Sequence, residues 1–258
     1  MSLNVVALEF PPISHVLEWP ELLFEDTPFA INKATILYVV AVGLTLGFFF
    51  VAGSQKRLVP TGVQNVAEAS IDFIRDGVIM QTMGPDGMRY LPFLTAIFFY
   101  VLFINIFEII PFVQFPATSR FAVPVLLALL VWVIYNVVGV MKQGLFGYLK
   151  SSLFPPGVPK FLYILVTPIE LVSTFLVRPL SLSVRLFANM LAGHLILVTF
   201  AILTAALWSK TLLIVVWPFS FGLLAGLTGF EILVSFLQAF IFTILTAVYI
   251  GGAMHPDH

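Results

Sequence analysis

Long apolar stretches separated by short charged clusters are the feature that most limits what this sequence can fold into. A helix needs about 20 apolar residues to cross the roughly 30 Å of hydrocarbon in a bilayer. Residues 34–52, 91–112 and 121–141 each supply one such stretch. Only 10% of the 258 residues are charged, whereas soluble domains carry about 25%. The sequence therefore predicts an all-α integral membrane protein.

Two further apolar stretches, 161–208 and 211–254, are about twice as long as one crossing requires. Two crossings within one stretch would need a polar turn in its middle, and neither stretch has one. We therefore expect each to form one long, tilted or kinked helix, which gives five transmembrane helices in a single membrane domain, 1–258. The expected kink sites are three prolines: Pro168, Pro179 and Pro218.

The segment between the first two crossings, residues 60–89, is too polar to span a membrane. Its apolar residues recur at every third or fourth position: Val63, Val66, Ala67, Ile71, Ile74 and Val78. Charged and amide residues fill the positions between them: Gln64, Glu68, Asp72, Arg75 and Asp76. This pattern predicts an amphipathic helix that lies on the membrane surface.

Basic residues indicate the orientation, because they gather on the cytoplasmic side of membrane proteins. The five-crossing topology puts one group of basic residues together: Lys56, Arg57, Arg75, Arg89, Lys142, Lys150 and Lys160. A smaller group lies opposite: Lys33, Arg120 and Lys210. We therefore expect the N-terminal segment 1–33 outside and the C-terminus in the cytoplasm. Residues 1–30 lack the basic region of a secretory signal peptide or a transit peptide.

Six ionisable residues interrupt the apolar stretches: Glu108, Glu170, Arg178, Arg185, His194 and Glu231. A charge at the bilayer centre costs about 2.5–3.5 kcal/mol even on insertion scales, so such residues usually have a function. Structural alternatives stay open for five of them. Glu170 and Arg178 could reach the interface from a helix end, and Glu108 could be interfacial. His194 could be a neutral packing residue, and Glu231 a passive hydrogen-bonding acid.

Helical phase groups several of these polar residues. At 100° per residue, Glu231, Gln238 and Tyr249 lie close to one line along a helix. Glutamate, glutamine and tyrosine side chains, with histidine and asparagine, are the usual links of a proton path through a membrane. The last stretch is therefore predicted to carry a polar stripe for protons.

The preceding stretch carries its polar residues on two faces. Arg178 and Arg185 are seven residues apart and share a face, and Asn189 is one turn after Arg185. His194 is nine residues after Arg185, which places it on the opposite side, so the two should face different neighbours. An arginine stays protonated and cannot relay a proton. We therefore interpret Arg185 as an electrostatic barrier, or a counter-ion, between two proton routes.

The segment PLSLSVRLFANMLAGH, from Pro179 to His194, and the segment EILVSFLQAF, from Glu231, resemble subunit a of the F-type ATP synthases. The segment NIFEIIP, from Asn105 to Pro111, matches the same family, and the resemblance extends over about residues 60–254. It implies a bacterial plasma-membrane stator with two half-channels facing a rotating ring of c subunits. It also implies b subunits and the remaining ATP synthase subunits as partners. Such a subunit translocates protons, is not itself an enzyme, and needs no cofactor or metal. The net charge of −1 also predicts that the protein has no nucleic-acid partner.

The resemblance also implies roles for individual residues. Arg185 corresponds to the family's essential arginine. The outer half-channel would contain Glu108, Asn189, His194, Glu231 and Gln238, and the inner one Glu170 and Ser173. Tyr249 and Arg178 join the expected proton path because they share faces with these residues.

Two features depart from the family pattern. His194 and Glu231 are exchanged relative to some bacterial members, as in mitochondrial members. They lie on successive long helices that the short link at 208–212 makes antiparallel, so we expect them to act as a pair that takes up and releases protons. The interval from Glu170 to Arg178 is one residue longer than the pattern, and an inserted residue of this kind can produce a π-bulge.

Two other classes of protein stay open. A secondary transporter also has broken helices and midplane charges, although this sequence has no internal repeat. A non-conducting scaffold subunit of a membrane complex would tolerate alanine at Arg185.

Overall fold

The computed structural model describes residues 32–54, 59–110, 113, 118, 121–154, 159–208 and 212–254, and these residues include no β-strand. Five helical segments of the described chain are long and apolar enough to cross a membrane: Lys33–Ser54, Pro85–Ile106, Ala122–Gln143, Tyr163–Leu207 and Trp217–Met254. The predicted all-α membrane fold with five spanning helices is therefore confirmed.

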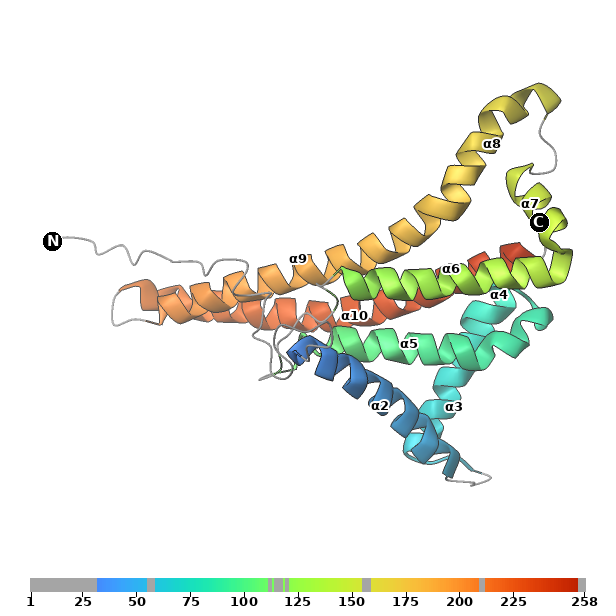
Figure 1. Ribbon diagram of the computed structural model, residues 1–258. Coiled ribbons are helices and arrows are strands. Elements are labelled where there is room, and N and C mark those ends of the chain that lie inside the picture. Colours follow the sequence, from blue (N-terminus) through green and yellow to red (C-terminus); the bar gives the residue numbers. More distant parts are fainter. Residues whose placement is uncertain are drawn as a thin grey trace.

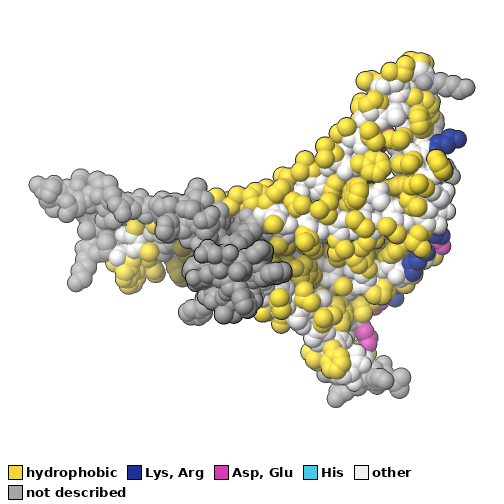
Figure 2. Space-filling model, viewed as in Figure 1, with side chains coloured by type: hydrophobic (Ala, Val, Ile, Leu, Met, Phe, Trp, Pro, Cys, Tyr) yellow, Lys and Arg dark blue, Asp and Glu magenta, His cyan; other side chains and the backbone are white. Residues whose placement is uncertain are grey.

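Helix α10 (Trp217–Met254) forms the centre of the bundle. It packs along α5 (Leu91–Ile106), α6 (Ala122–Gln143) and α9 (Arg178–Leu207), whereas α2 (Lys33–Ser54) packs only on the α5 side and diverges from the bundle (Figure 1). The core between these helices is filled by fully buried side chains: Leu94, Val131, Leu186, Phe242 and Ile250. Apolar side chains also cover most of the visible outer surface, which suits contact with lipid (Figure 2).

Each of the two longest apolar stretches forms one helical rod, as predicted. Helix α8 (Tyr163–Val172) continues through a π-helix, η5 (Ser173–Val177), into α9 without interruption. The 45 residues from Tyr163 to Leu207 would measure about 68 Å at 1.5 Å per residue. This exceeds the hydrocarbon thickness about twofold, and Figure 1 shows that the rod is curved.

The prolines act differently from one another. Pro168 lies inside α8, and Pro179 lies in the first turn of α9, directly after η5. The expectation that Pro218 kinks a helix is wrong, because Pro218 is the second residue of α10. Proline is well tolerated in a first turn, where its missing N–H has no intrahelical acceptor to serve.

The segment 60–89 is broken into α3 (Val63–Ile74), a π-helix η1 (Arg75–Ile79), α4 (Met80–Thr82) and a 3-10 helix η2 (Pro85–Tyr90). Ala67, Ile74 and Val78 are buried, as the amphipathic pattern predicts. In the first turn of α3 the predicted pattern is wrong, because Val63 and Val66 are exposed and Gln64 is buried. The buried face is rotated because α3 packs against both α2 and α5. Its position on a membrane surface stays a prediction.

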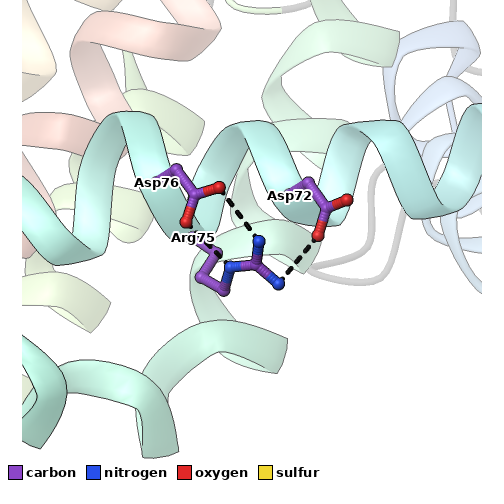
Figure 3. Close-up of polar contacts among 3 residues, drawn as sticks. All are labelled: Asp72, Arg75 and Asp76. Atoms are coloured by element: carbon purple, nitrogen blue, oxygen red, sulfur yellow. Dashed lines mark hydrogen bonds and ion pairs between the residues drawn. The ribbon is translucent and has the colours of Figure 1, made fainter.

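The polar side of this segment carries an exposed ion-pair cluster (Figure 3). The Arg75 guanidinium lies 2.9 Å from Oδ1 of Asp72 and 2.8 Å from Oδ1 of Asp76. The hydrogen bond from Arg75 lowers the pKa of the Asp76 carboxyl below its ordinary value. All three side chains are solvent-accessible, so the cluster contributes little to stability.

Contacts between helix ends show which loops lie together. At one end, Arg89 Nη2 lies 3.3 Å from Sδ of Met254, and Gln143 Nε2 donates to the carbonyl of Ala253 at 2.8 Å. At the other end, Lys33 Nζ donates to the carbonyl of Val113 at 2.9 Å. The Lys and Arg side chains visible in Figure 2 gather at the first of these ends, where α6 meets α7 (Leu145–Leu153).

This grouping of loops is the one that five crossings require. Some of the residues used for the orientation lie outside the described residues: segment 1–31, Lys56, Arg57, Arg120 and Lys210. Most of the predicted link from Pro111 to Arg120 also lies outside them. Which end faces the cytoplasm therefore stays a prediction.

Candidate functional site

A buried acid–histidine contact lies where α5 ends against α9. Glu108 follows the last turn of α5, and its Oε1 atom is 3.6 Å from Nδ1 of His194 in α9. The two side chains are only 2% and 7% exposed. The distance is too long for a good hydrogen bond but is within ion-pair range. His194 is therefore placed against an acidic group, which packing alone would not require.

Glu231 reaches the same region from α10. A Cβ atom added at Gly193 would lie 2.7 Å from each carboxylate oxygen of Glu231, so this carboxylate rests on the α9 backbone beside His194. Glu231 also interacts electrostatically with Glu108. We call Glu108, His194 and Glu231 the acid–histidine cluster. His194 lies in α9, Glu231 lies in α10, and Glu108 follows the end of α5.

The sequence predicts that His194 and Glu231 act as a pair, but the structure shows no ion pair between them. Among the described residues, the ion pair of His194 is with Glu108, and none joins it to Glu231. Glu231 instead occupies the space that the missing side chain of Gly193 leaves open. The two carboxylates therefore approach this part of α9 from different segments, the turn after α5 and helix α10.

Replacing Gly193 with alanine should lower proton flux through the protein. The new methyl group would overlap the Glu231 carboxylate, which can swing away because it is the end of a flexible side chain. The protein should therefore still fold, but the Glu231 carboxylate should move away from its present position. We expect proton flux to fall roughly tenfold, since a 1 Å misplacement of a reacting group can lower a rate about a hundredfold. The measurement is ATP-driven acidification of inverted vesicles at matched protein levels.

Gly226→Ala provides the matched control. Gly226 also lies in a long helix, but a Cβ added there would meet no atom within 4 Å. Alanine at such a site changes helix stability by at most about 1 kcal/mol, so proton flux should stay at the wild-type level. Equal fluxes in the two variants would contradict the placement of Glu231 against Gly193.

The polar stripe predicted on α10 is largely buried. Glu231 and Gln238 are both buried, and Ser235 between them is 4% exposed. Tyr249 is half-buried and lies farther along the same helix. Ser235 was not among the predicted site residues, although its position one turn after Glu231 places it on the same line. The stripe continues the acid–histidine cluster along α10.

Asn105 is a second residue that the sequence interpretation left out of the site. It lies in α5 one turn before Glu108 and is 3% exposed. Neither its amide nitrogen nor its amide oxygen has a hydrogen-bond partner among the described residues. A buried amide of this kind is unusual, because buried polar groups are nearly always paired. Its signal in the sequence was an amide inside an apolar stretch, three residues before a carboxylate.

Arg185 lies on the outer surface of α9. Its side chain is exposed, and its neighbours on that face are apolar or small: Val184, Ala188 and Ala192. Leu186 and His194 are buried toward the other helices. The prediction that Arg185 and His194 face different neighbours is therefore confirmed. Among the described residues no carboxylate forms an ion pair with Arg185.

The remaining predicted residues are spread along the same rod. Arg178 stacks over the ring of Tyr249, with Cζ at 5.5 Å from the ring centroid, so α9 and α10 meet there. Asn189 is half-buried between Arg185 and His194. Glu170 and Ser173 are half-buried in α8 and η5, and no hydrogen bond or ion pair of the described residues connects them to the acid–histidine cluster.

Comparison with known proteins gives a consistent result. Residues 35–251 match the family model described as ATP synthase A chain. "ATP synthase subunit a" of Rhodococcus erythropolis is 42% identical, with 92% of this chain and 88% of the relative covered. The protein of the same name from Frankia alni is 42% identical, over 88% of this chain and 79% of the relative. The one from Hyphomonas neptunium is 39% identical, over 97% and 98%. These similarities do not favour a secondary transporter.

Proposed function

This chain belongs to the ATP synthase A chain family, and on that premise we propose how its side chains carry protons. The acid–histidine cluster takes up a proton from one side of the membrane. The proton then moves along the α9–α10 contact, past Gln238 and Asn189, toward the outer face that carries Arg185. There it neutralises a carboxylate on a partner ring of c subunits.

One observation carries this proposal. The single exposed face of α9 around Arg185 and the buried acid–histidine cluster lie on opposite sides of the same helix. An exposed arginine on an apolar helix needs an opposite charge or water outside this chain, because an isolated charge in hydrocarbon is expensive. A ring carboxylate satisfies that need. The helix would then separate proton uptake on one face from proton loading on the other.

A second route would release protons on the opposite side. Glu170 and Ser173 lie in α8 and η5, which precede Arg185 in the chain, whereas His194 follows it. The stacked Arg178 and Tyr249 lie between these residues and Arg185. In this proposal Glu170 and Ser173 line the inner half-channel, and the two arginines keep the half-channels apart, since neither can relay a proton.

The proposed setting is the bacterial plasma membrane, with the N-terminus outside and the C-terminus in the cytoplasm. The chain is a multi-pass membrane protein of the ATP synthase complex and works with other subunits of that complex. We propose the c-subunit ring and the b subunits as its direct partners. The chain forms no phosphate bond in this scheme, so ATP synthesis itself takes place elsewhere in the complex.

The direct test is passive proton conductance of the membrane sector. Vesicles that contain the membrane subunits, without the ATP-hydrolysing part, should dissipate an imposed pH gradient when this chain is present. Vesicles with the same subunits but without this chain should keep the gradient. Equal dissipation in both preparations would refute proton translocation by this chain and favour a scaffold role.

A further inference from the structure

The register change at the π-helix η5 leaves the carbonyl of Thr174 without its α-helical donor. The N–H of Arg178 donates to the carbonyl of Ser173, five residues earlier, as a π-helix requires. In an α-helix the same N–H would serve the carbonyl of Thr174. The next possible donor to Thr174 in π register is residue 179, which is proline and has no N–H.

Tyr135 of α6 fills this gap from outside the rod. Its hydroxyl donates to the carbonyl of Thr174 at 2.7 Å. Both residues are buried, with 1% of Tyr135 and 3% of Thr174 exposed. A buried carbonyl without a donor is strongly unfavourable, so this hydrogen bond stabilises the π-helix specifically.

Aromatic contacts also hold α6 against the π-helix η5. The Tyr135 ring lies 5.8 Å from the ring of Tyr249, the residue on which Arg178 stacks. One turn earlier in α6, Trp132 lies 6.5 Å from Phe175 of η5, centroid to centroid. Helix α6 therefore contacts the π-helix at two points, and the Tyr135 hydroxyl hydrogen-bonds to its backbone.

We propose that Tyr135 is a positioning residue that sets the rotation of α9, and hence the direction in which Arg185 points. A π-helix absorbs one extra residue, so its conversion to an α-helix would turn the following helix by about 100° relative to α8. Arg185 lies only about two helical turns after the end of η5. Without the hydroxyl of Tyr135, the π-helix becomes less stable and the Arg185 face loses its fixed orientation. This inference rests on the proposed function of Arg185.

The test is Tyr135→Phe, which removes the hydroxyl and keeps the ring. Because the chain contains no cysteine, spin labels can be placed at two exposed positions flanking η5, Ile169→Cys and Leu180→Cys, in the assembled membrane sector. We expect the label–label distance distribution to shift or broaden in Tyr135→Phe. Coupled proton pumping without labels should fall roughly fivefold, the effect of one lost hydrogen bond.

A matched variant distinguishes this role from simple packing. Thr45→Val removes another buried hydroxyl, which donates to the carbonyl of Ala41 at 2.8 Å within α2, a helix that packs against α5 and α3. It should change neither the label–label distances nor the pumping.

Three results would overturn the inference. They are an unchanged distance distribution in Tyr135→Phe, a changed distribution with normal pumping, and equal changes in Tyr135→Phe and Thr45→Val. The distance measurement does not depend on proton flow. If the wild-type membrane sector conducted no protons, the proposed function would be refuted. The label–label distances would still test whether Tyr135 stabilises the π-helix.

Discussion

Arg185→Ala should abolish ATP-driven proton pumping while leaving the protein folded and assembled. The side chain is exposed on α9 and makes no ion pair within the described chain, so its removal breaks no internal ion pair. A membrane charge interaction of about 2.5–3.5 kcal/mol corresponds to a change of about a hundredfold, at 1.36 kcal/mol per factor of ten. We therefore expect pumping in inverted vesicles to fall by about that factor or more.

The loss should be accompanied by a proton leak. Without the fixed positive charge, a protonated ring carboxylate could pass between the half-channels without a full rotation. Vesicles stripped of the ATP-hydrolysing part should then lose an imposed pH gradient at least as fast as the wild type. Arg185→Lys should also fail to pump, because an ammonium lacks the planar fork of the guanidinium and can lose its proton when desolvated.

Arg75→Ala is the matched control for these variants. It also removes an exposed arginine, but one whose partners are the exposed carboxylates of Asp72 and Asp76. Exposed ion pairs contribute at most about 1 kcal/mol, so pumping should be nearly normal. Normal pumping by Arg185→Ala would refute the barrier role and support a scaffold subunit.

Much of this architecture could be predicted from local features of the sequence. The stretches 161–208 and 211–254 lack a polar turn, which is sufficient to predict single long helices. The extra residue between Glu170 and Arg178 indicated a π-bulge, and the structure has η5 there. Helical phase alone predicted that Arg185 and His194 lie on different faces. Each of these conclusions depends only on neighbours along one helix.

The partner of each buried charge could not be predicted in the same way. Helical phase gives the face on which His194 lies but not the helix that packs against that face. Glu108 is far from His194 in the sequence, and its approach depends on how α5 ends against α9. The close approach of Glu231 depends on Gly193, whose missing side chain lets a carboxylate rest on the backbone. Such contacts follow from tertiary packing, which sequence periodicity does not contain.

Exchange variants should reveal which carboxylate works with His194. His194→Glu would put a third carboxylate into the acid–histidine cluster, where like charges repel and the imidazole is lost. We expect proton flux to fall by about a hundredfold, within the range for losing a proton-transfer group. A second change that returns an imidazole to the correct place should recover part of the flux. The measurement is proton pumping in inverted vesicles at matched expression.

The structure favours Glu108 as the position for that second change. Its carboxylate is the one at ion-pair distance from His194, at 3.6 Å, so His194→Glu with Glu108→His would rebuild an acid beside an imidazole with their helices exchanged. His194→Glu with Glu231→His would instead place an imidazole ring against the α9 backbone at Gly193, where the Glu231 carboxylate now lies. We therefore expect greater recovery with Glu108→His. Greater recovery with Glu231→His would show that Glu231 is the working partner and that the contact between Glu108 and His194 only packs the helix ends together.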